Sequence, residues 1–125
     1  MSKSVLVSLG RWIFGLVFLV FGILHFINAG GMTGIVPGWI PGGAFWVYLT
    51  GVAMILAAIS ILSGKMTSLA GQLLALMLLI FVLTIHLPSV VGGGSPSGLL
   101  KDLGLMAGSL LVAAYLGEDA EAEEA

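Results

Sequence analysis

The 125-residue chain contains no cysteine and very little charge. Without cysteine it cannot form disulfides, perform thiol redox chemistry or ligate an iron–sulfur cluster by itself. Only four residues are lysine or arginine, and they form no basic patch, so nucleic acid is not an expected partner. All acidic residues except Asp102 lie in residues 118–125, which we expect to form a solvated tail.

The shortage of carboxylates also argues against several enzyme classes. Asp102 is the only carboxylate before the acidic tail, so no carboxylate pair is available for glycosidase chemistry. No glycine-rich phosphate loop follows a strand pattern, and no serine has an evident partner for nucleophilic catalysis. We therefore expect that the chain is not catalytic alone.

Apolar residues, in contrast, make up 59% of the chain, and charged residues only 8%. A soluble domain carries about a quarter charged residues, so this composition indicates a membrane protein. Four apolar stretches have about the length needed to cross a bilayer. They predict an all-α fold, an integral membrane four-helix bundle with antiparallel up-down order, in a single domain of residues 1–117. The expected spans are residues 5–27, 44–62, 69–87 and 99–116.

The few cations predict the orientation of these spans. Lys3 and Lys65 fall on the same side of the membrane, whereas the first and third loops carry no charge until Lys101. The positive-inside rule therefore places both termini, and the acidic tail 118–125, in the cytoplasm. The first stretch exceeds the apolar region of a signal peptide and no small-residue cleavage site follows it, so we expect it to be retained.

The loops differ in character. Residues 28–43 are too rich in glycine and proline for a spanning helix, yet they include apolar residues that favour the membrane interface. Trp39 and Trp46 are typical of the aromatic belt at that level. Pro88 is expected to end the third span.

The predicted topology brings polar residues of separate spans to one level. His25 ends the first span, His86 ends the third, and Lys101 with Asp102 opens the fourth. Ionisable groups inside a membrane are costly, so their gathering predicts a functional site. Alternatively, they lie at the water interface, where histidine and lysine cost little.

Small residues predict how the helices pack. Arg11, Gly15, Phe18, Gly22 and His25 fall on one face of a helix because they are spaced by four and three residues. Gly104 and Gly108 form a GxxxG pattern in the fourth span, which allows close approach between helices. Gly71 and Ala75 offer a similar surface on the third.

Arg11 lies one or two turns inside the cytoplasmic end of the first span. The preferred interpretation is that its side chain extends to the lipid headgroups and sets the orientation of the span. The alternative pairs it with Glu118 or Asp119 at the end of the fourth span.

Taken together, these motifs resemble the DoxX family of small bacterial and archaeal membrane proteins. The resemblance rests on Arg11, Gly15, Phe18, Gly22, His25, Phe26, Pro37, Ile40–Pro41, Gly51, His86–Leu87–Pro88, Lys101–Asp102–Leu103 and Gly108. Many relatives have a glutamate shortly after the glycine of the second span, where this chain has Met54. The resemblance implies a four-helix protein of a bacterial or archaeal cytoplasmic membrane. The family is named after the small subunit of a thiosulfate:quinone oxidoreductase, and other members look like accessory subunits of membrane redox systems.

Three hypotheses for function follow. The first is an accessory subunit of a quinone-linked oxidoreductase complex, with a quinone held by hydrogen-bond donors beside aromatic rings. Its candidate ligand-binding residues are His25, Asn28, His86, Lys101, Asp102, Phe26 and Trp39. The second is a haem held by His25 and His86, and no other metal site is expected. The third is a structural subunit that fills a gap in a larger membrane assembly. Besides lipid, the expected partner is another membrane protein or a second copy of the chain.

Overall fold

The computed structural model describes residues 1–117, which contain helices and turns but no strand. The predicted tail, residues 118–125, lies outside the described residues. The long helices are α1 (Lys3–Ile27), α3 (Ala44–Ser63), α4 (Thr67–Phe81) and α6 (Ser97–Leu116). Two short elements, α2 (Ala29–Met32) and the 3₁₀-helix η1 (Thr33–Ile35), lie between α1 and α3. The prediction of an all-α chain with four long apolar helices is confirmed, since four helical segments are long and apolar enough to cross a membrane.

The third helical segment does not end at Pro88, so that prediction was wrong. After α4 the chain forms a π-helical turn, η2 (Val82–His86), and then α5 (Leu87–Val91). Proline lacks the N–H that an α-helix would use here. Just before the proline, the π turn replaces the α-helical hydrogen-bond pattern, because Leu87 N–H donates to the carbonyl oxygen of Val82, five residues earlier. The helix then resumes, and Gly92 N–H donates to Pro88 O at 3.0 Å.

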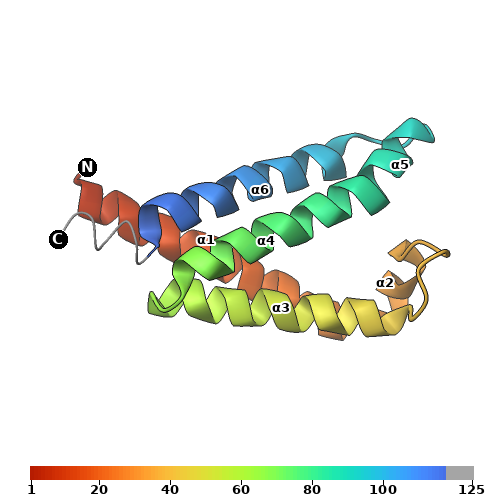
Figure 1. The fold of residues 1–125 in the computed structure, drawn as a ribbon, viewed down its shortest axis with the longest axis horizontal. Helices are drawn as coiled ribbons and strands as arrows, with labels where there is room; N and C mark the ends of the chain where they lie inside the picture. The colour runs from red at the N-terminus through yellow and green to blue at the C-terminus, as the bar shows by residue number, and fades with distance from the viewer. Residues whose placement is uncertain (118–125) are drawn as a thin grey trace.

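The long helices run alternately up and down and associate as two pairs, α1 with α3 and α4 with α6 (Figure 1). At one end of the molecule α1 begins, α6 ends, and residues 64–66 connect α3 to α4; we call this the turn end. At the other end lie residues 28–43 and α5; we call this the loop end. Contact between the pairs is made mainly by α3 with α4.

Glycines bring the backbones of each pair into close contact. A Cβ atom added to Gly22 of α1 would lie 2.9 Å from the carbonyl oxygen of Gly51 in α3. A Cβ atom added to Gly71 of α4 would lie 2.7 Å from the carbonyl oxygen of Ser109 in α6. Both distances are too short for a side chain, so only glycine permits this packing.

The predicted helix faces are only partly observed. The buried residues of α1 are Gly15, Phe18, Gly22 and His25, as the spacing predicts. The GxxxG prediction for α6 was wrong at Gly104, which has no other part of the described chain within 4 Å of an added Cβ. The contact face of α6 toward α4 instead contains Ser109, and Gly108 packs against the Phe14 ring of α1.

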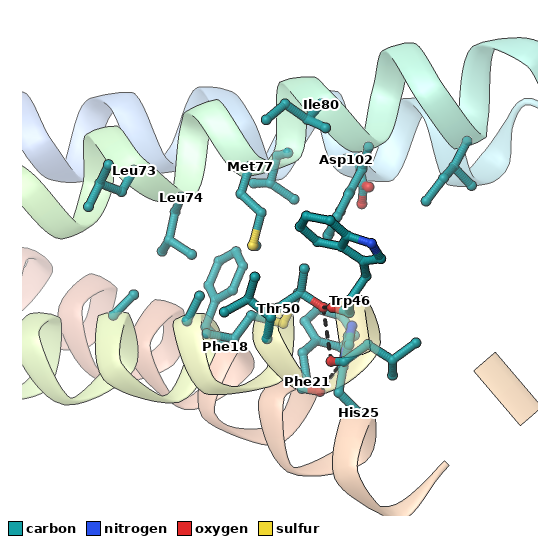
Figure 2. Close-up of a pocket in the computed structure, with 18 of the residues that line it drawn as sticks. Phe18, Phe21, His25, Trp46, Thr50, Leu73, Leu74, Met77, Ile80 and Asp102 are labelled. Carbon is teal, nitrogen blue, oxygen red and sulfur yellow. Dashed lines mark hydrogen bonds between the residues drawn. The ribbon is translucent and has the colours of Figure 1, made fainter. Parts of the chain in front are cut away.

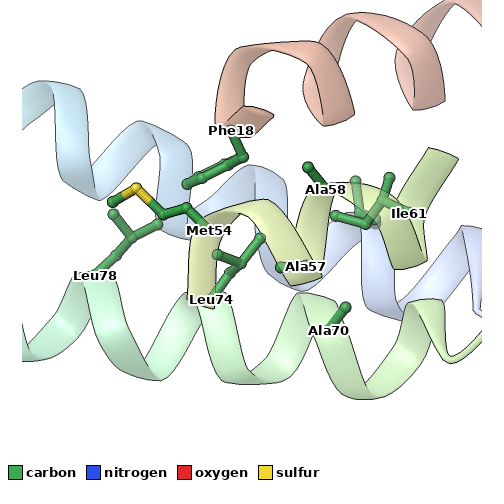
Figure 3. Close-up of a cluster of buried hydrophobic side chains, with 9 residues drawn as sticks. Phe18, Met54, Ala57, Ala58, Ile61, Ala70, Leu74 and Leu78 are labelled. Atoms are coloured by element: carbon green, nitrogen blue, oxygen red, sulfur yellow. The ribbon is translucent and has the colours of Figure 1, made fainter. Parts of the chain in front are cut away.

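A small apolar core joins the two pairs (Figure 3). Phe18 of α1 is fully buried in this core, beside residues of both α3 and α4. Its other buried members combine alanines, which suit close helix packing, with larger aliphatic side chains: Met54, Ala57, Ala58, Ile61, Ala70, Leu74, Leu78 and Val112.

The glycine contacts generate a stability prediction. Gly71→Ala should lower the free energy of unfolding by about 1–3 kcal/mol, because the new methyl group meets backbone atoms that cannot rotate away. Gly104→Ala is the matched control, and it should raise stability by about 0.5–1 kcal/mol because alanine favours a helix over glycine. Thermal unfolding in a single detergent measures both. Equal effects of the two variants would contradict the described packing.

Candidate functional site

A cavity of about 1020 Å³ lies between the two helix pairs. Its walls are α1, residues 32–40, α3, α4, η2 and α6. Most of the lining is apolar, and it extends along α3 and α4 to Ser60 and Met66 near the turn end. Four ionisable residues line it, and all come from the loop end: His25, His86, Lys101 and Asp102. Figure 2 shows His25 and Asp102 on opposite helix pairs.

His25 lies near the end of α1 and is 9% exposed. Its ring atom Nδ1 lies 2.6 Å from the carbonyl oxygen of Phe21, one turn earlier in the helix. Gly51 of α3 permits the close approach of His25, because a Cβ added to Gly51 would lie 2.9 Å from the Cβ of His25. The close contact of α1 with α3 therefore positions His25.

His86, Asp102 and Lys101 form a connected polar group across from His25. His86 Nε2 lies 2.7 Å from Asp102 Oδ2, and Lys101 Nζ lies 3.6 Å from Oδ1. The Asp102 side chain is only 5% exposed, so its charge needs these partners. Gly98 permits the approach of His86, because a Cβ added there would lie 2.8 Å from Nδ1.

Sequence reasoning missed Phe21, which joins the two sides of the site. Its carbonyl oxygen bonds to His25, and its ring centroid lies 5.4 Å from Lys101 Nζ, within range of a cation–π interaction. Its position four residues before His25, one helical turn away, could have indicated that its carbonyl oxygen faces the histidine. Thr50 was also missed, although it is a polar residue within an apolar span; its hydroxyl donates to the carbonyl oxygen of Trp46 at 2.8 Å.

The structure brings together most, but not all, of the predicted site residues. His25, His86, Lys101, Asp102, Trp39 and Pro37 line the cavity. Asn28 does not, and its backbone N–H caps the end of α1. Phe26 lies outside the cavity, where its ring packs against Tyr48 with centroids 5.4 Å apart. Pro41 contributes only its carbonyl oxygen, which accepts a hydrogen bond from Trp46 Nε1.

Arg11 forms a second polar site, at the turn end. Its guanidinium donates to the carbonyl oxygen of Ile61 at 2.7 Å and to that of Leu116 at 3.4 Å, near the ends of α3 and α6. It also donates to the hydroxyl of Thr67 at 3.4 Å. Arg11 thus donates to groups within the protein, whereas the preferred interpretation from the sequence directed it to the lipid headgroups. Helix ends leave carbonyl oxygens unpaired, and these accept its hydrogen bonds. Glu118 and Asp119 lie outside the described residues.

The arrangement of the histidines is relevant to metals. The described residues contain no group of three or more side chains suited to hold a metal ion. An axial haem ligand needs an available ring nitrogen, and His86 Nε2 is engaged by Asp102. A haem held by both histidines would therefore have to use His86 Nδ1, which lies against Gly98, or break the bond of Nε2 to Asp102.

The contacts of Arg11 generate a second stability prediction. Arg11→Lys keeps the charge but loses the fork of donors that reaches two helix ends. We expect the free energy of unfolding to fall by about 1–3 kcal/mol, the usual contribution of hydrogen bonds to charged groups. Chemical or thermal unfolding measures this, with the exposed Lys65→Arg as control. Equal stability of Arg11→Lys and the wild type would contradict it.

Comparison with known proteins identifies a family. A family model described as a domain of unknown function (DUF8561) matches residues 14–100, which include both histidines and end just before Lys101. No curated protein and no solved structure matches the chain. Because the family model covers well over half of its length, the chain belongs to the DUF8561 family.

Proposed function

We propose that this chain is a small integral membrane protein that binds a quinone between its helix pairs, as an accessory subunit of a membrane redox complex. Its four long apolar helices suit a bilayer. Many large apolar side chains on them are exposed, which suits contact with lipid or a membrane partner. The resemblance to DoxX proteins supports the redox assignment and a bacterial or archaeal cytoplasmic membrane.

The shape of the cavity carries the proposal. A quinone combines a ring bearing two polar oxygens with an apolar tail. The cavity likewise has its ionisable residues at the loop end and an apolar lining along α3 and α4. Its volume of about 1020 Å³ is large enough for a ligand of this kind.

The burial of Asp102 favours this function over a structural subunit with an interfacial polar group. A carboxylate at the water interface needs no protein partner. Asp102 is 5% exposed and bonds to His86 on another helical element. Such a buried, connected group is costly to maintain, and in a membrane it typically marks a ligand or ion site.

The first test is quinone binding by the purified protein in lipid nanodiscs. A short-chain prenylated benzoquinone, tested in its oxidised and its reduced form, should bind, and His25→Ala and His86→Ala should each weaken the binding of at least one form about tenfold by removing a polar contact. Isothermal titration calorimetry measures the affinity. Gln72→Ala is the control, because Gln72 is exposed and its hydrogen bonds within residues 1–117 are to Ser68. Absence of binding by the wild type would contradict the proposal.

The second test concerns the orientation. We propose that the turn end is cytoplasmic, because Lys3, Arg11 and Lys65 lie toward it. The chain has no cysteine, so Ser63→Cys and Ser95→Cys each introduce a single thiol at opposite ends. In intact cells a membrane-impermeant maleimide should label Ser95→Cys, and it should label Ser63→Cys only after permeabilisation. The reverse pattern would overturn the orientation.

A further inference from the structure

The hydrogen bond of His25 determines which of its ring nitrogens carries a proton. A carbonyl oxygen can only accept, so Nδ1, which lies 2.6 Å from the oxygen of Phe21, must be the donor. In the neutral ring Nε2 therefore carries a lone pair and accepts hydrogen bonds. No hydrogen bond to Nε2 is formed within the described residues, and His25 lines the cavity. The cavity wall formed by α1 thus presents an acceptor.

The opposite wall presents an acceptor as well. Asp102 receives the Nε2–H of His86 on Oδ2, and Lys101 Nζ lies 3.6 Å from Oδ1. A carboxylate has about four lone-pair positions. His86 occupies one of them and Lys101 lies beyond hydrogen-bond distance, so at least two are left for a ligand at the loop end of the cavity.

The donors of the helices at this end are already engaged. The hydroxyl of Thr50 donates to the carbonyl oxygen of Trp46, and that of Thr84 donates to Ile80. Trp46 Nε1 donates to the carbonyl oxygen of Pro41. The remaining donors are Lys101 and the loop residue Trp39, and they are largely exposed, by 54% for the Lys101 side chain and by 74% for Trp39. Apart from Lys101 at its exposed edge, the polar end of the cavity is thus rich in acceptors and poor in donors.

We infer that the cavity binds the reduced, hydroxyl-bearing form of its ligand, a quinol, more tightly than the quinone. This inference rests on the proposed function. A quinone ring offers two carbonyl acceptors, which would face the acceptors of His25 and Asp102. A quinol offers two hydroxyl donors, which His25 Nε2 and Asp102 can each accept. Both forms have the same apolar tail, so we assign the preference to the polar groups on the ring.

The size of the preference follows from the cost of an unpaired buried polar group. Such a mismatch is expected to weaken quinone binding about tenfold or more relative to quinol. For a two-electron couple a tenfold difference corresponds to about 30 mV, and tighter quinol binding makes the bound midpoint potential more positive. Preference for the quinol is therefore measurable in two independent ways.

The experiment uses the full chain in nanodiscs with one prenylated benzoquinone and its dithionite-reduced quinol under argon. Equilibrium dialysis gives both affinities, and a redox titration gives the potential of the bound couple. We expect at least tenfold tighter quinol binding and a potential about 30 mV above that of the free couple in empty nanodiscs. Equal affinities, or tighter quinone binding, would overturn the inference while leaving quinone binding intact. Absence of binding by both forms would overturn the proposed function as well.

Two variants assign the preference to named atoms. His25→Phe removes the acceptor and keeps an aromatic ring, so quinol affinity should fall about tenfold while quinone affinity changes little. Asp102→Asn replaces a carboxylate by an amide that can donate, so the quinol-to-quinone ratio should fall by a similar factor. Gln72→Ala, outside the cavity, should keep the wild-type ratio. If His25→Phe does not fold because of its contact with Gly51, the wild-type ratio and Asp102→Asn decide the question; unchanged ratios in the folded variants would overturn the assignment.

Discussion

The backbone contact between Gly22 and Gly51 is the constraint on which the site depends. It brings α1 against α3 closely enough to bury His25. The contact of Gly71 with Ser109 likewise brings α4 against α6. Each pair therefore packs tightly within itself. The pairs meet mainly through α3 and α4, and the space left between them is the cavity. The cavity thus results from unequal packing between helices rather than from a missing side chain.

Electrostatics then determines what this space can hold. A buried carboxylate without partners is very costly, and Asp102 obtains a partner from η2 and another from the residue before it. The polarity of the site follows from these pairings, since each hydrogen that is used to stabilise the protein is no longer available to a ligand. Fold stability and ligand preference are in this way set by the same hydrogen bonds.

Much of this arrangement could be predicted from the sequence, because it depends on periodicity and on the order of the helices. The buried face of α1 followed from residue spacing, and the meeting of His25 with His86 and Asp102 followed from alternating helix directions. What could not be predicted depends on rotation about a helix axis or on local geometry. The rotation of α6 about its axis turns Gly104 away from the other helices. Phe26 lies one residue after His25, beyond the buried face of α1. The π turn before Pro88, and the proton position on His25, leave no trace in composition or spacing.

Arg11 has a mechanical consequence for the far end of the molecule. Its bonds hold α1 to α3, α4 and α6 at the turn end, whereas at the loop end the pairs are separated by the cavity and joined by the contact of Lys101 with the Phe21 ring. His25 lies 14 residues beyond Arg11 on the same helix, or about 21 Å at 1.5 Å per residue. Rotation of one helix pair about the turn end by about 5° would shift its loop end by roughly 2 Å, while the turn end stays nearly still. The spacing of His25 and Asp102 is therefore more sensitive to a small rotation of one helix pair than the contacts of Arg11 are.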